Sequence, residues 1–348
     1  MAEKQRNKMI VSLGKKWLFF LIVLSMFPAG LSAVLAQAGA PAQPLETVIM
    51  GVVGLSTNSI HPFISRDAGL FAKYGIDARL VVFEGGSTLA QAAISGEVKF
   101  SDTAGPVTIS SRSAGAETVI IAGHINIMPY SLISAKGITR WEQLKGKRIA
   151  ISRFGSGTDT AVRLVLTKFG LNPEKDVTLV QLGAQSSRFA ALVAGSTDAT
   201  LVAPPFDVTA KKQGYPILAD MAPLGIPYAQ QVLETTDRMI REHPQTVKNI
   251  LKGFVAGIHH GFTNPEATKK ILVKYLKVTD TEILERTYQH YMEITERKPY
   301  PNMEGVRYAV DEVAKRIATA KGKKPEDFIN LRFLNELERE GFFNELSK

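Results

Sequence analysis

The chain has 348 residues, of which 45% are hydrophobic and 22% are charged, and its formal net charge is +9. This composition is that of a globular protein long enough for two domains, which excludes a disordered chain. No basic tract or aromatic-interleaved basic patch predicts binding to nucleic acid. The absence of cysteine excludes disulfides, a thiol nucleophile and a lipid-modified cysteine. The hydrophobic core alone is therefore expected to hold the fold.

The first 36 residues have the pattern of a secretory signal peptide. Basic residues precede an apolar run over Trp17–Phe27, and the small residues Ala33–Ala36 provide a cleavage site. The apolar run is about half of the roughly 20 residues that a spanning helix needs, although extension toward Ala36 would make a marginal membrane anchor. We predict a signal peptide over residues 1–36, a linker over 37–44 and a periplasmic mature chain, which an uncleaved segment would tether to the membrane. Without residues 1–36 the net charge is +5.

Strands and helices alternate through the first two thirds of the remaining chain. Strands are predicted at residues 47–53, 76–83, 100–103, 118–122, 147–152, 177–182, 199–202 and 217–219. Helices are predicted between them at 60–73, 89–95, 105–113, 158–169, 186–194 and 206–213, and then in succession at 238–262, 265–276, 281–295, 306–320 and 331–340. Short loops between alternating elements predict mostly parallel sheets covered on both faces, in two α/β lobes followed by a helical region.

The segment Lys147–Ala161 joins an apolar strand to a helix through an arginine and a glycine-serine loop. Gly155 and Gly157 permit a tight turn, and Thr158 or Asp159 can cap the helix. Unpaired N–H groups and a partial positive charge at a helix start can hold an anion. The loop lacks both the Gly-Lys-Ser/Thr ending of a P-loop and the third glycine of a dinucleotide motif. An ordinary glycine turn with a helix cap is the alternative interpretation.

Three loops share this position between a strand and a helix: Ser56–Ser59, Gly85–Thr88 and Gly155–Asp159. In open α/β sheets, ligands bind outside the carboxyl ends of the strands, where such loops lie. Two lobes that face each other with these loops would form a cleft lined by helix starts and hydroxyl groups.

Several stretches carry a resemblance to a known family. They are Pro62–Asp77, Gly85–Ser87, Gly96–Phe100, Leu144–Ala150 and the segment from Gly195 to Pro204. In these stretches the chain resembles the periplasmic solute-binding proteins of ABC transporters of the nitrate/sulfonate/taurine class. The resemblance covers most of the mature chain.

The resemblance implies the type II periplasmic-binding fold, with two α/β lobes that close on a ligand like a hinge. Lobe 1 is expected to comprise residues 45–133 and 228–348, and lobe 2 residues 134–227. Two passes between the lobes are expected near Tyr130–Ala135 and Tyr228–Leu233. The family implies a monomer without cofactor or metal that delivers a small-molecule ligand to ABC permease and ATPase subunits.

The candidate ligand-binding residues lie on the three loops and at two further strand ends. They are Ser56, Thr57, Asn58, His61, Gly86, Ser87, Thr88, Asp102, Thr103, Arg153, Gly155, Ser156, Gly157, Thr158, Pro204 and Phe206. Arg153 can bind a sulfonate, carboxylate or nitrate bidentately, or it can be a solvated loop arginine. Arg66, Arg112 and Arg188 are predicted to lie on helix surfaces. Tyr130 and several phenylalanines can form an apolar wall for the ligand or belong to the core.

Two alternatives to a transport protein remain. The fold also occurs in thiamine-pyrimidine synthases, in which a histidine is consumed, and His61 lies where such a histidine would be expected. Because those enzymes carry a cysteine-rich motif and work inside cells, the lack of cysteine and the export signal favour a binding protein. The adjacent His259 and His260 point about 100° apart on a helix and do not make a metal site. A ligand-binding sensor is the second alternative, which the sequence does not exclude.

Overall fold

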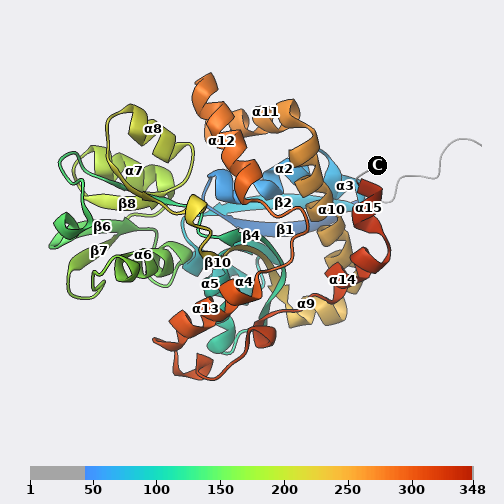
Figure 1. Ribbon diagram of the computed structural model, residues 1–348. Helices are drawn as coiled ribbons and strands as arrows, with labels where there is room; N and C mark the ends of the chain where they lie inside the picture. Colours follow the sequence, from blue (N-terminus) through green and yellow to red (C-terminus); the bar gives the residue numbers. More distant parts are fainter. Residues whose placement is uncertain (1–43, 347–348) are drawn as a thin grey trace, which may run out of the picture. The chain divides into compact units, whose positions relative to one another are not determined.

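The computed structural model describes residues 44–346, and the chain from Leu45 onward forms one compact unit (Figure 1). The predicted signal peptide over residues 1–36 and nearly all of the predicted linker lie outside the described residues. Within residues 44–346, no helix is both long and apolar enough to cross a membrane.

Two five-stranded sheets organise the unit. Sheet A has the strand order β2-β1-β3-β10-β4 and sheet B the order β7-β6-β8-β5-β9. The strands of sheet A are β1 (Glu46–Val53), β2 (Ile76–Phe83), β3 (Phe100–Thr103), β4 (Thr118–Ile127) and β10 (Pro227–Thr236). Those of sheet B are β5 (Ser131–Ser134), β6 (Lys147–Ile151), β7 (Val177–Gln181), β8 (Ala199–Val202) and β9 (Ile217–Asp220). We call each sheet with its helices lobe 1 and lobe 2, respectively.

Each sheet is parallel in one half and antiparallel in the other. In sheet A, β1 pairs in parallel with β2 and β3, whereas β10 runs antiparallel to β3 and β4. In sheet B, β6 pairs in parallel with β7 and β8, whereas β5 runs antiparallel to β8 and β9. The antiparallel strands β5 and β10 are the first strands that the chain forms after each passage from one sheet to the other.

The two passages lie just before the predicted positions. The chain leaves sheet A after Ile127 and enters sheet B at Ser131, and it leaves sheet B after Asp220 and re-enters sheet A at Pro227. The stretches in which the resemblance implied crossover strands are therefore mostly strands β5 and β10. Their continuous burial explains why alternation did not mark them, because a strand covered on both faces reads as an apolar run.

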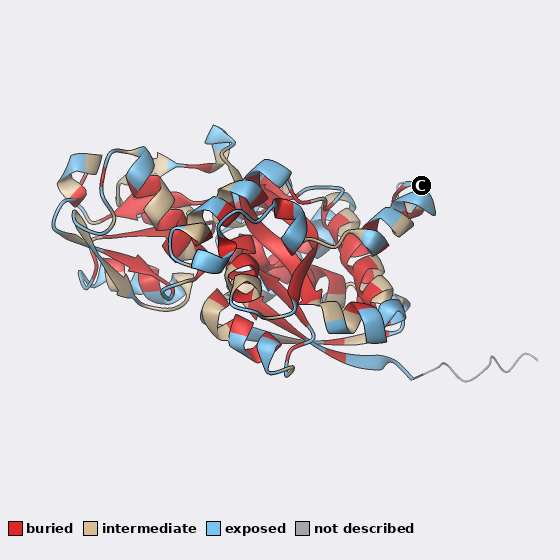
Figure 2. Ribbon diagram, turned by 90° about the horizontal axis from the view of Figure 1, so that it is seen from below, coloured by how far each residue is buried: buried red, intermediate tan, exposed pale blue. Residues whose placement is uncertain are grey.

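Helices cover both sheets, as predicted. In chain order they are η2 (Thr57–Ser59), α2 (His61–Asp67), α3 (Leu70–Lys73), α4 (Gly86–Ile94), α5 (Gly105–Ser113), η3 (Trp141–Leu144), α6 (Gly157–Lys168), α7 (Gln185–Val193), α8 (Phe206–Lys212), η4 (Ala222–Leu224), α9 (Asp237–Glu242), α10 (Pro244–Thr263), α11 (Pro265–Leu276), α12 (Thr281–Ile294), α13 (Met303–Ala314), η5 (Ala318–Ala320), η6 (Pro325–Phe328), α14 (Arg332–Arg339) and α15 (Phe342–Leu346). Figure 2 shows the buried residues gathered along the strands and on the inner faces of these helices.

Helix α10 illustrates how the core forms. Its buried residues Val247, Leu251, Phe254 and Ile258 recur every three or four positions, which places them on one face against sheet A. A second core cluster, which includes Ile149 of β6, fills lobe 2. Each lobe thus has its own hydrophobic core.

Some predicted helices were too long. The helix predicted over 60–73 is interrupted at Gly69, which has a left-handed φ of 72°, and the helix predicted over 238–262 is divided at His243 before Pro244. The helix predicted over 306–320 begins at Met303 and ends at Ala314, and α15 was not predicted.

Candidate functional site

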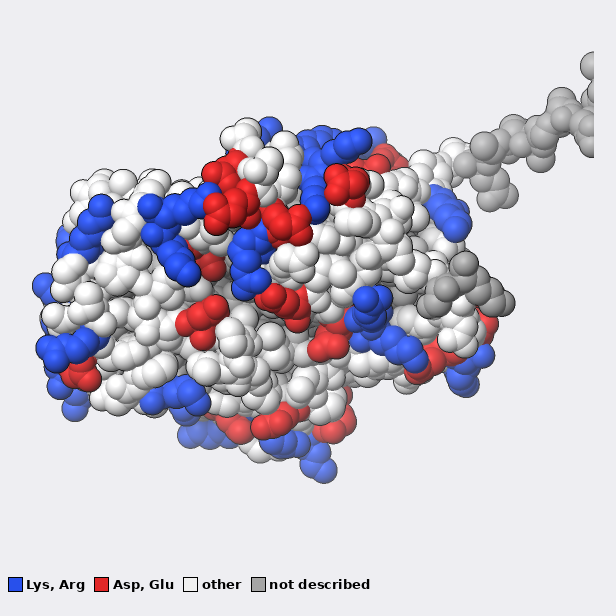
Figure 3. All heavy atoms as spheres, turned by 45° about the horizontal axis from the view of Figure 1, so that its top comes forward, with Lys and Arg blue, Asp and Glu red and all other residues white. Residues whose placement is uncertain are grey.

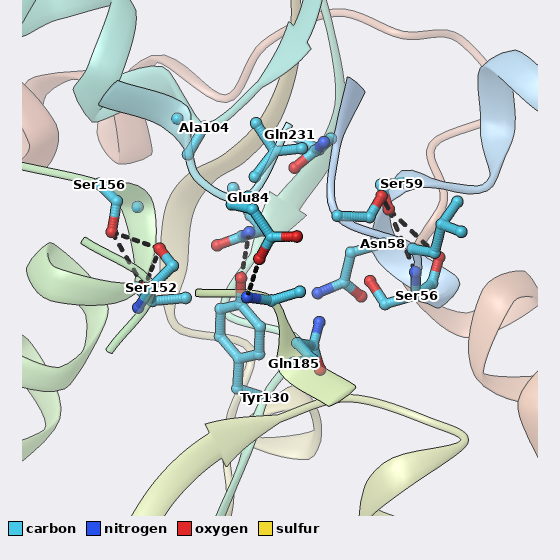
Figure 4. Close-up of a pocket in the computed structure, with 18 of the residues that line it drawn as sticks. Ser56, Asn58, Ser59, Glu84, Ala104, Tyr130, Ser152, Ser156, Gln185 and Gln231 are labelled. Carbon is cyan, nitrogen blue, oxygen red and sulfur yellow. Dashed lines mark hydrogen bonds between the residues drawn. The ribbon is translucent and has the colours of Figure 1, made fainter. Parts of the chain in front are cut away.

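A cavity of about 50 Å³ lies between the two lobes (Figure 4). Its lining from lobe 1 and the strands that join the lobes is Val53, Gly54, Leu55, Ser56, Asn58, Ser59, Glu84, Gly86, Ala104, Tyr130, Gln230 and Gln231. Its lining from lobe 2 is Ser152, Ser156, Gly157, Thr158, Ala184, Gln185 and Arg188. A water molecule needs roughly 10–15 Å³ of such space, so the cavity has room for only a few heavy atoms.

Helix starts surround the cavity. The turn η2 and the helices α4, α5, α6 and α7 each follow a strand and begin at or next to a lining residue. The first N–H groups of a helix have no partner within the helix, and its start carries a partial positive charge. These elements therefore favour a negatively charged group in the cavity, whose lining also contains the carboxylate of Glu84.

Arg188 supplies a full positive charge to the cavity. It is 1% exposed, and its guanidinium donates to Thr200 Oγ1 (3.1 Å) and to the carbonyls of Gly183 (2.6 Å) and Leu201 (3.1 Å). These bonds use three of its five N–H donors. Within residues 44–346 no carboxylate forms an ion pair with it; Glu84 accepts the N–H of Ala184 (2.9 Å) and acts on Arg188 only through its charge, which raises the pKa of the guanidinium. Burial lowers the pKa of Arg188 to about 10, which leaves the group charged at neutral pH.

The prediction that Arg188 lies on a helix surface was therefore wrong. Arg188 and Leu192 are the buried residues of α7, and they are four positions apart on one face. An arginine on the same face as a leucine in a helix that follows a strand was the signal in the sequence. It was missed because arginine is seldom fully buried, so its residue type alone predicts a surface position.

Two carboxamides of the cavity have unpaired atoms. Asn58 is 3% exposed, and neither its amide nitrogen nor its amide oxygen has a hydrogen-bond partner of ordinary geometry. Gln230 is 2% exposed and donates from Nε2 to the Tyr130 hydroxyl (2.7 Å), which leaves its Oε1 without a partner. Burial raises the pKa of Tyr130, so this hydroxyl stays protonated. Figure 4 shows Asn58 and Tyr130 reaching into the cavity from different sides.

Six of the predicted site residues line the cavity: Ser56, Asn58, Gly86, Ser156, Gly157 and Thr158. Each lies at a helix start after a strand, which was the reasoning behind the prediction. The predicted cap was wrong, because Ser156 caps α6 by accepting the Asp159 N–H (3.3 Å) and Thr158 instead accepts the Ser152 N–H (2.9 Å).

The two glycines of this loop have different roles. Gly155 has a left-handed φ of 75°, which a residue with a side chain rarely adopts. Gly157 permits a close approach of the lobes, because a Cβ atom there would lie 2.4 Å from the Cβ of Ala104. Gly155 thus shapes the turn, while Gly157 lets lobe 2 reach lobe 1.

The structure does not bring the other ten predicted residues into the cavity lining: Thr57, His61, Ser87, Thr88, Asp102, Thr103, Arg153, Gly155, Pro204 and Phe206. Thr57 donates its N–H to the Pro204 carbonyl across the two lobes (3.3 Å). The Thr88 hydroxyl closes its own loop on the Gly85 carbonyl (2.7 Å), and Phe206 begins α8. Arg153 is exposed, and its stem lies beside Gly85.

His61 and Asp102 lie inside lobe 1. His61 is 1% exposed, with Nε2 at 3.0 Å from the Phe254 carbonyl and Nδ1 at 3.3 Å from the Tyr291 hydroxyl. Burial lowers the pKa of His61 well below its usual value, so it is neutral at pH 7. Asp102 is fully buried on β3 and pairs with His124 Nε2 (2.9 Å). His61 follows β1 and η2 in the sequence, and Asp102 lies near the end of β3. Both side chains are buried inside lobe 1 instead of lining the cavity.

Sequence reasoning missed most of the lining that lies outside the three loops. Gln230 and Gln231 lie on β10 and Gln185 begins α7, while Tyr130 was weighed only as part of an apolar wall. Glu84 directly precedes the predicted loop Gly85–Thr88, and Ser152 is the last residue of the predicted strand 147–152. Polar residues within or beside otherwise apolar strands were the available signal. Gln230 and Gln231 reach the cavity only because β10 pairs with β3 and β4 of sheet A.

The two lobes are in contact on several sides of the cavity. Hydrogen bonds or ion pairs join Thr57 to Pro204, Glu84 to Ala184, Arg316 to Asp159, and Lys212 to both Asp280 and Glu282. The last group lies where α8 of lobe 2 meets α12 of lobe 1, and Figure 3 shows charges of both signs side by side on this face. The cleft is therefore closed in this structure, which accounts for the small cavity.

A profile described as "NMT1/THI5 like" matches residues 56–268, which is more than half of the chain. The chain belongs to the NMT1/THI5-like family. The matched region contains both sheets apart from β1, and all of the cavity lining outside β1 and its two following residues. A curated relative from Brucella abortus is 26% identical over 221 residues, which are 62% of this chain and 67% of the relative. Its name describes a binding protein and states no ligand.

Solved structures share the fold. A protein of Bordetella bronchiseptica RB50 is 20% identical, with a TM-score of 0.75 over 84% of this chain and 97% of that chain. The alkanesulfonate-binding protein SsuA of Xanthomonas axonopodis pv. citri, bound to MOPS, is 18% identical, with a TM-score of 0.67 over 82% and 96%. The periplasmic nitrate-binding protein NrtA of Synechocystis PCC 6803 is 14% identical, with a TM-score of 0.72 over 85% and 89%.

These findings confirm the predicted resemblance and the predicted periplasmic-binding fold with two α/β lobes and a helical carboxyl-terminal region. At such identities the structural likeness concerns the fold alone. Within residues 44–346, no group of three or more histidine, aspartate or glutamate side chains is arranged to hold a metal ion.

Proposed function

We propose that this protein is the extracytoplasmic solute-binding component of an ABC importer, which encloses a small anion between its lobes and delivers it to a permease with its ATPase. The family and the fold neighbours, two of which are named as binding proteins for alkanesulfonate and nitrate, support a binding protein. The binding site that we propose is the cavity between the lobes.

The buried charge of Arg188 carries the proposal. Removing a charge from water is costly unless a partner of opposite charge or several hydrogen bonds compensate it. Arg188 is fully buried in the cavity wall with three hydrogen bonds, and among the described residues no carboxylate lies within ion-pair distance of it, although Glu84 of the same lining is near enough to raise its pKa. An anionic ligand would complete its coordination, since a guanidinium binds carboxylates, sulfonates and nitrate through paired N–H groups. The surrounding helix starts would add to the attraction.

The contacts between the lobes support a hinged mechanism. The cavity of about 50 Å³ between contacting lobes has room for only a few heavy atoms, so a larger solute enters only if the lobes separate. Ligand binding would then favour the closed arrangement, because only there do both lobes contact it. A permease could recognise the closed form by the relative position of the two lobe surfaces.

His61, on which the synthase alternative depends, gives that alternative no support. Its ring is enclosed by Phe254 and Tyr291 and lines no part of the cavity. We also propose that the segment before residue 44 directs export, which fractionation of cells expressing the full chain and a chain without residues 1–36 would test. We expect a monomer, since the cavity is built from residues of one chain.

The test of the function is ligand binding by wild-type protein and an Arg188→Met variant. A thermal-shift screen of nitrate, sulfonates and carboxylates against neutral analogues of the same size should give stabilisation by an anion, because a ligand that binds only the folded state stabilises it. Calorimetry should then show at least a 50-fold loss of affinity in Arg188→Met and no loss in Arg339→Met, which removes an exposed arginine of α14. Native mass spectrometry of protein purified from its own cells would identify a retained ligand. Absence of any anion-dependent stabilisation at millimolar concentration would contradict the proposal.

A further inference from the structure

The cavity presents more than a site for negative charge. Asn58, in the turn η2, is 3% exposed, and neither atom of its amide makes a hydrogen bond of ordinary geometry within the described residues, although the amide lies near enough to the Tyr130 hydroxyl to lower its pKa. This observation does not depend on how the amide is turned, because one unpaired atom is a donor and the other an acceptor in either orientation. Figure 4 shows the amide directed into the cavity.

Buried polar atoms without partners are rare in folded proteins, because each costs the hydration that it has lost. The unpaired donor of Asn58 can be satisfied by any anion. Its unpaired acceptor requires an O–H or N–H group, which nitrate and simple alkanesulfonates do not have.

Gln230 and Glu84 also favour a ligand that carries a hydrogen-bond donor. Gln230 has one amide atom bound to the Tyr130 hydroxyl and the other without a partner. Glu84 uses one carboxylate oxygen to accept the Ala184 N–H and lines the cavity as an acceptor with negative charge. A purely anionic ligand would face Glu84 unfavourably, whereas a ligand with a hydrogen-bond donor would offer it a partner.

We propose that the ligand is a small acid that carries an O–H or N–H donor besides its anionic group, such as a hydroxy acid, an amino acid or their sulfonate equivalents. The anionic group binds Arg188 and the helix starts, and the donor binds the amide oxygen of Asn58. This inference rests on the proposed binding function and specifies the class of solute. It excludes nitrate and unsubstituted alkanesulfonates as the principal ligands of this chain.

Matched pairs of acids test the inference. Glycolate and propionate have the same number of heavy atoms, as do hydroxymethanesulfonate and ethanesulfonate, and within each pair only the first has an O–H donor. We expect calorimetry on purified protein, freed of retained ligand by unfolding and refolding, to show at least tenfold tighter binding of the donor-bearing member. A site built around polar groups rejects an analogue that leaves them unpaired.

Variants assign the preference to Asn58. Asn58→Leu, which has a similar size and no polar atom, should reduce the preference within each pair to less than threefold, and Asn335→Leu on the exposed surface of α14 should leave it unchanged. Asn58→Ala serves the same purpose if the leucine variant does not fold. A preference that persists in these variants would overturn the role of Asn58.

The outcomes separate the two proposals. Equal affinity of wild-type protein for both members of each pair would overturn the ligand class while leaving the anion-binding function intact. Failure of all four acids to bind, with no stabilisation by other anions, would overturn the binding function itself and this inference with it.

Discussion

Two buried polar regions of the protein contrast in how their charges are compensated. In the cavity, Arg188 has no carboxylate within ion-pair distance and Asn58 has no hydrogen bond of ordinary geometry among residues 44–346. Inside lobe 1, Asp102 pairs with His124, and His61 contacts the Phe254 carbonyl and the Tyr291 hydroxyl. We call these last side chains, Asp102, His124, His61 and Tyr291, the lobe 1 cluster. Each of these side chains has a partner within the cluster, although Asp102 Oδ2 and His124 Nδ1 have none among the described residues, whereas we propose that a ligand supplies the missing partners in the cavity.

This contrast shows that burial alone does not identify a binding residue. His61 and Asp102 are as buried as Arg188, and all three lie near the strand ends where ligands bind. They differ in their partners. Asp102 binds His124 and His61 binds Tyr291, whereas Arg188 has no ion-pair partner among the described residues. Mutations should therefore affect stability in the lobe 1 cluster and ligand affinity in the cavity.

The largest effect is expected from Asp102→Ala in the lobe 1 cluster. The change removes the carboxylate bound to His124, whose Nδ1 already lacks a partner, so the buried imidazole would have no hydrogen bond left. Breaking a buried pair costs about 3–5 kcal/mol. Urea titration should show this loss in the free energy of unfolding, while affinity for the ligand of the folded protein stays within a factor of about two.

Asp311→Ala is the matched control, because Asp311 is exposed on α13, and its stability should stay close to wild type. A large loss of affinity in Asp102→Ala at temperatures where the variant is fully folded would break the distinction between the two regions.

A smaller and pH-dependent effect is expected from Glu234→Gln. Glu234 is 1% exposed on β10, and burial raises its pKa from 4.5 to about 7. Because the folded protein holds a proton that the unfolded chain has lost between these pH values, Glu234 lowers the stability as pH rises from about 4.5 to 7. The total is on the order of 3 kcal/mol at pH 8.

Urea titrations from pH 5 to 9 should show that Glu234→Gln gains stability over wild type as the pH rises, with the difference levelling off above pH 7. Glu97→Gln, at an exposed position, should follow the wild-type curve. A constant difference between Glu234→Gln and wild type across this range would show that Glu234 is charged in the fold. That result would also weaken the argument for a ligand at Arg188, because the protein would then hold a buried charge without a partner of opposite charge elsewhere.

Removing the contact between Arg316 and Asp159, which joins the two lobes, should have a smaller effect than the two preceding substitutions. Arg316, which follows α13 of lobe 1, donates to Asp159 Oδ2 (2.8 Å) and Thr160 Oγ1 (3.3 Å) of lobe 2. Since Arg316 is partly exposed, its pair with Asp159 is expected to contribute about 1 kcal/mol to closure. Arg316→Gln should therefore weaken ligand binding about fivefold without any contact to the ligand.

Small-angle scattering should show that this variant needs more ligand to reach the compact form. Arg163→Gln is the contrasting variant, since Arg163 binds Asp159 within lobe 2 (2.6 Å) and should affect stability more than closure. Unchanged affinity in Arg316→Gln would mean that this contact does not oppose opening.

The sequence predicted the fold well because its signals are local. Strand β2 over Ile76–Phe83 and helix α5 over Gly105–Ser113 begin and end where the pattern placed them, since glycine and turn residues bound both. Strands β5 and β10 lie where the family resemblance implied crossover strands, but the local pattern did not predict them, because their role depends on pairing with distant strands. Local pattern does not encode that pairing.

The candidate site was predicted only in part for the same reason. The residues at helix starts, such as Ser56 and Gly157, follow from the position of each loop after a strand. Whether a side chain at such a position points into the cavity or into the core depends on the packing of the whole lobe. Asp102 and Arg188 were therefore assigned to the wrong environments, although their neighbourhoods were correctly located.

Arg153→Ala should have the smallest effect, and it sharpens the comparison between a buried and an exposed arginine. The sequence alone left open whether Arg153 binds the anion or is a solvated loop arginine; in the first case its removal would cost about 1.5–3 kcal/mol. In the structure Arg153 is exposed beside Gly85 and outside the cavity lining, so its charge is screened by solvent. We expect an affinity within about threefold of wild type. An exposed charge near a binding site acts mainly on the association rate, so stopped-flow measurements should show slower binding at low salt and no difference at about 0.5 M salt. A loss of affinity that persists at high salt would place Arg153 in contact with the ligand. The ligand would then bind two arginines, Arg153 from the exposed loop and Arg188 from α7.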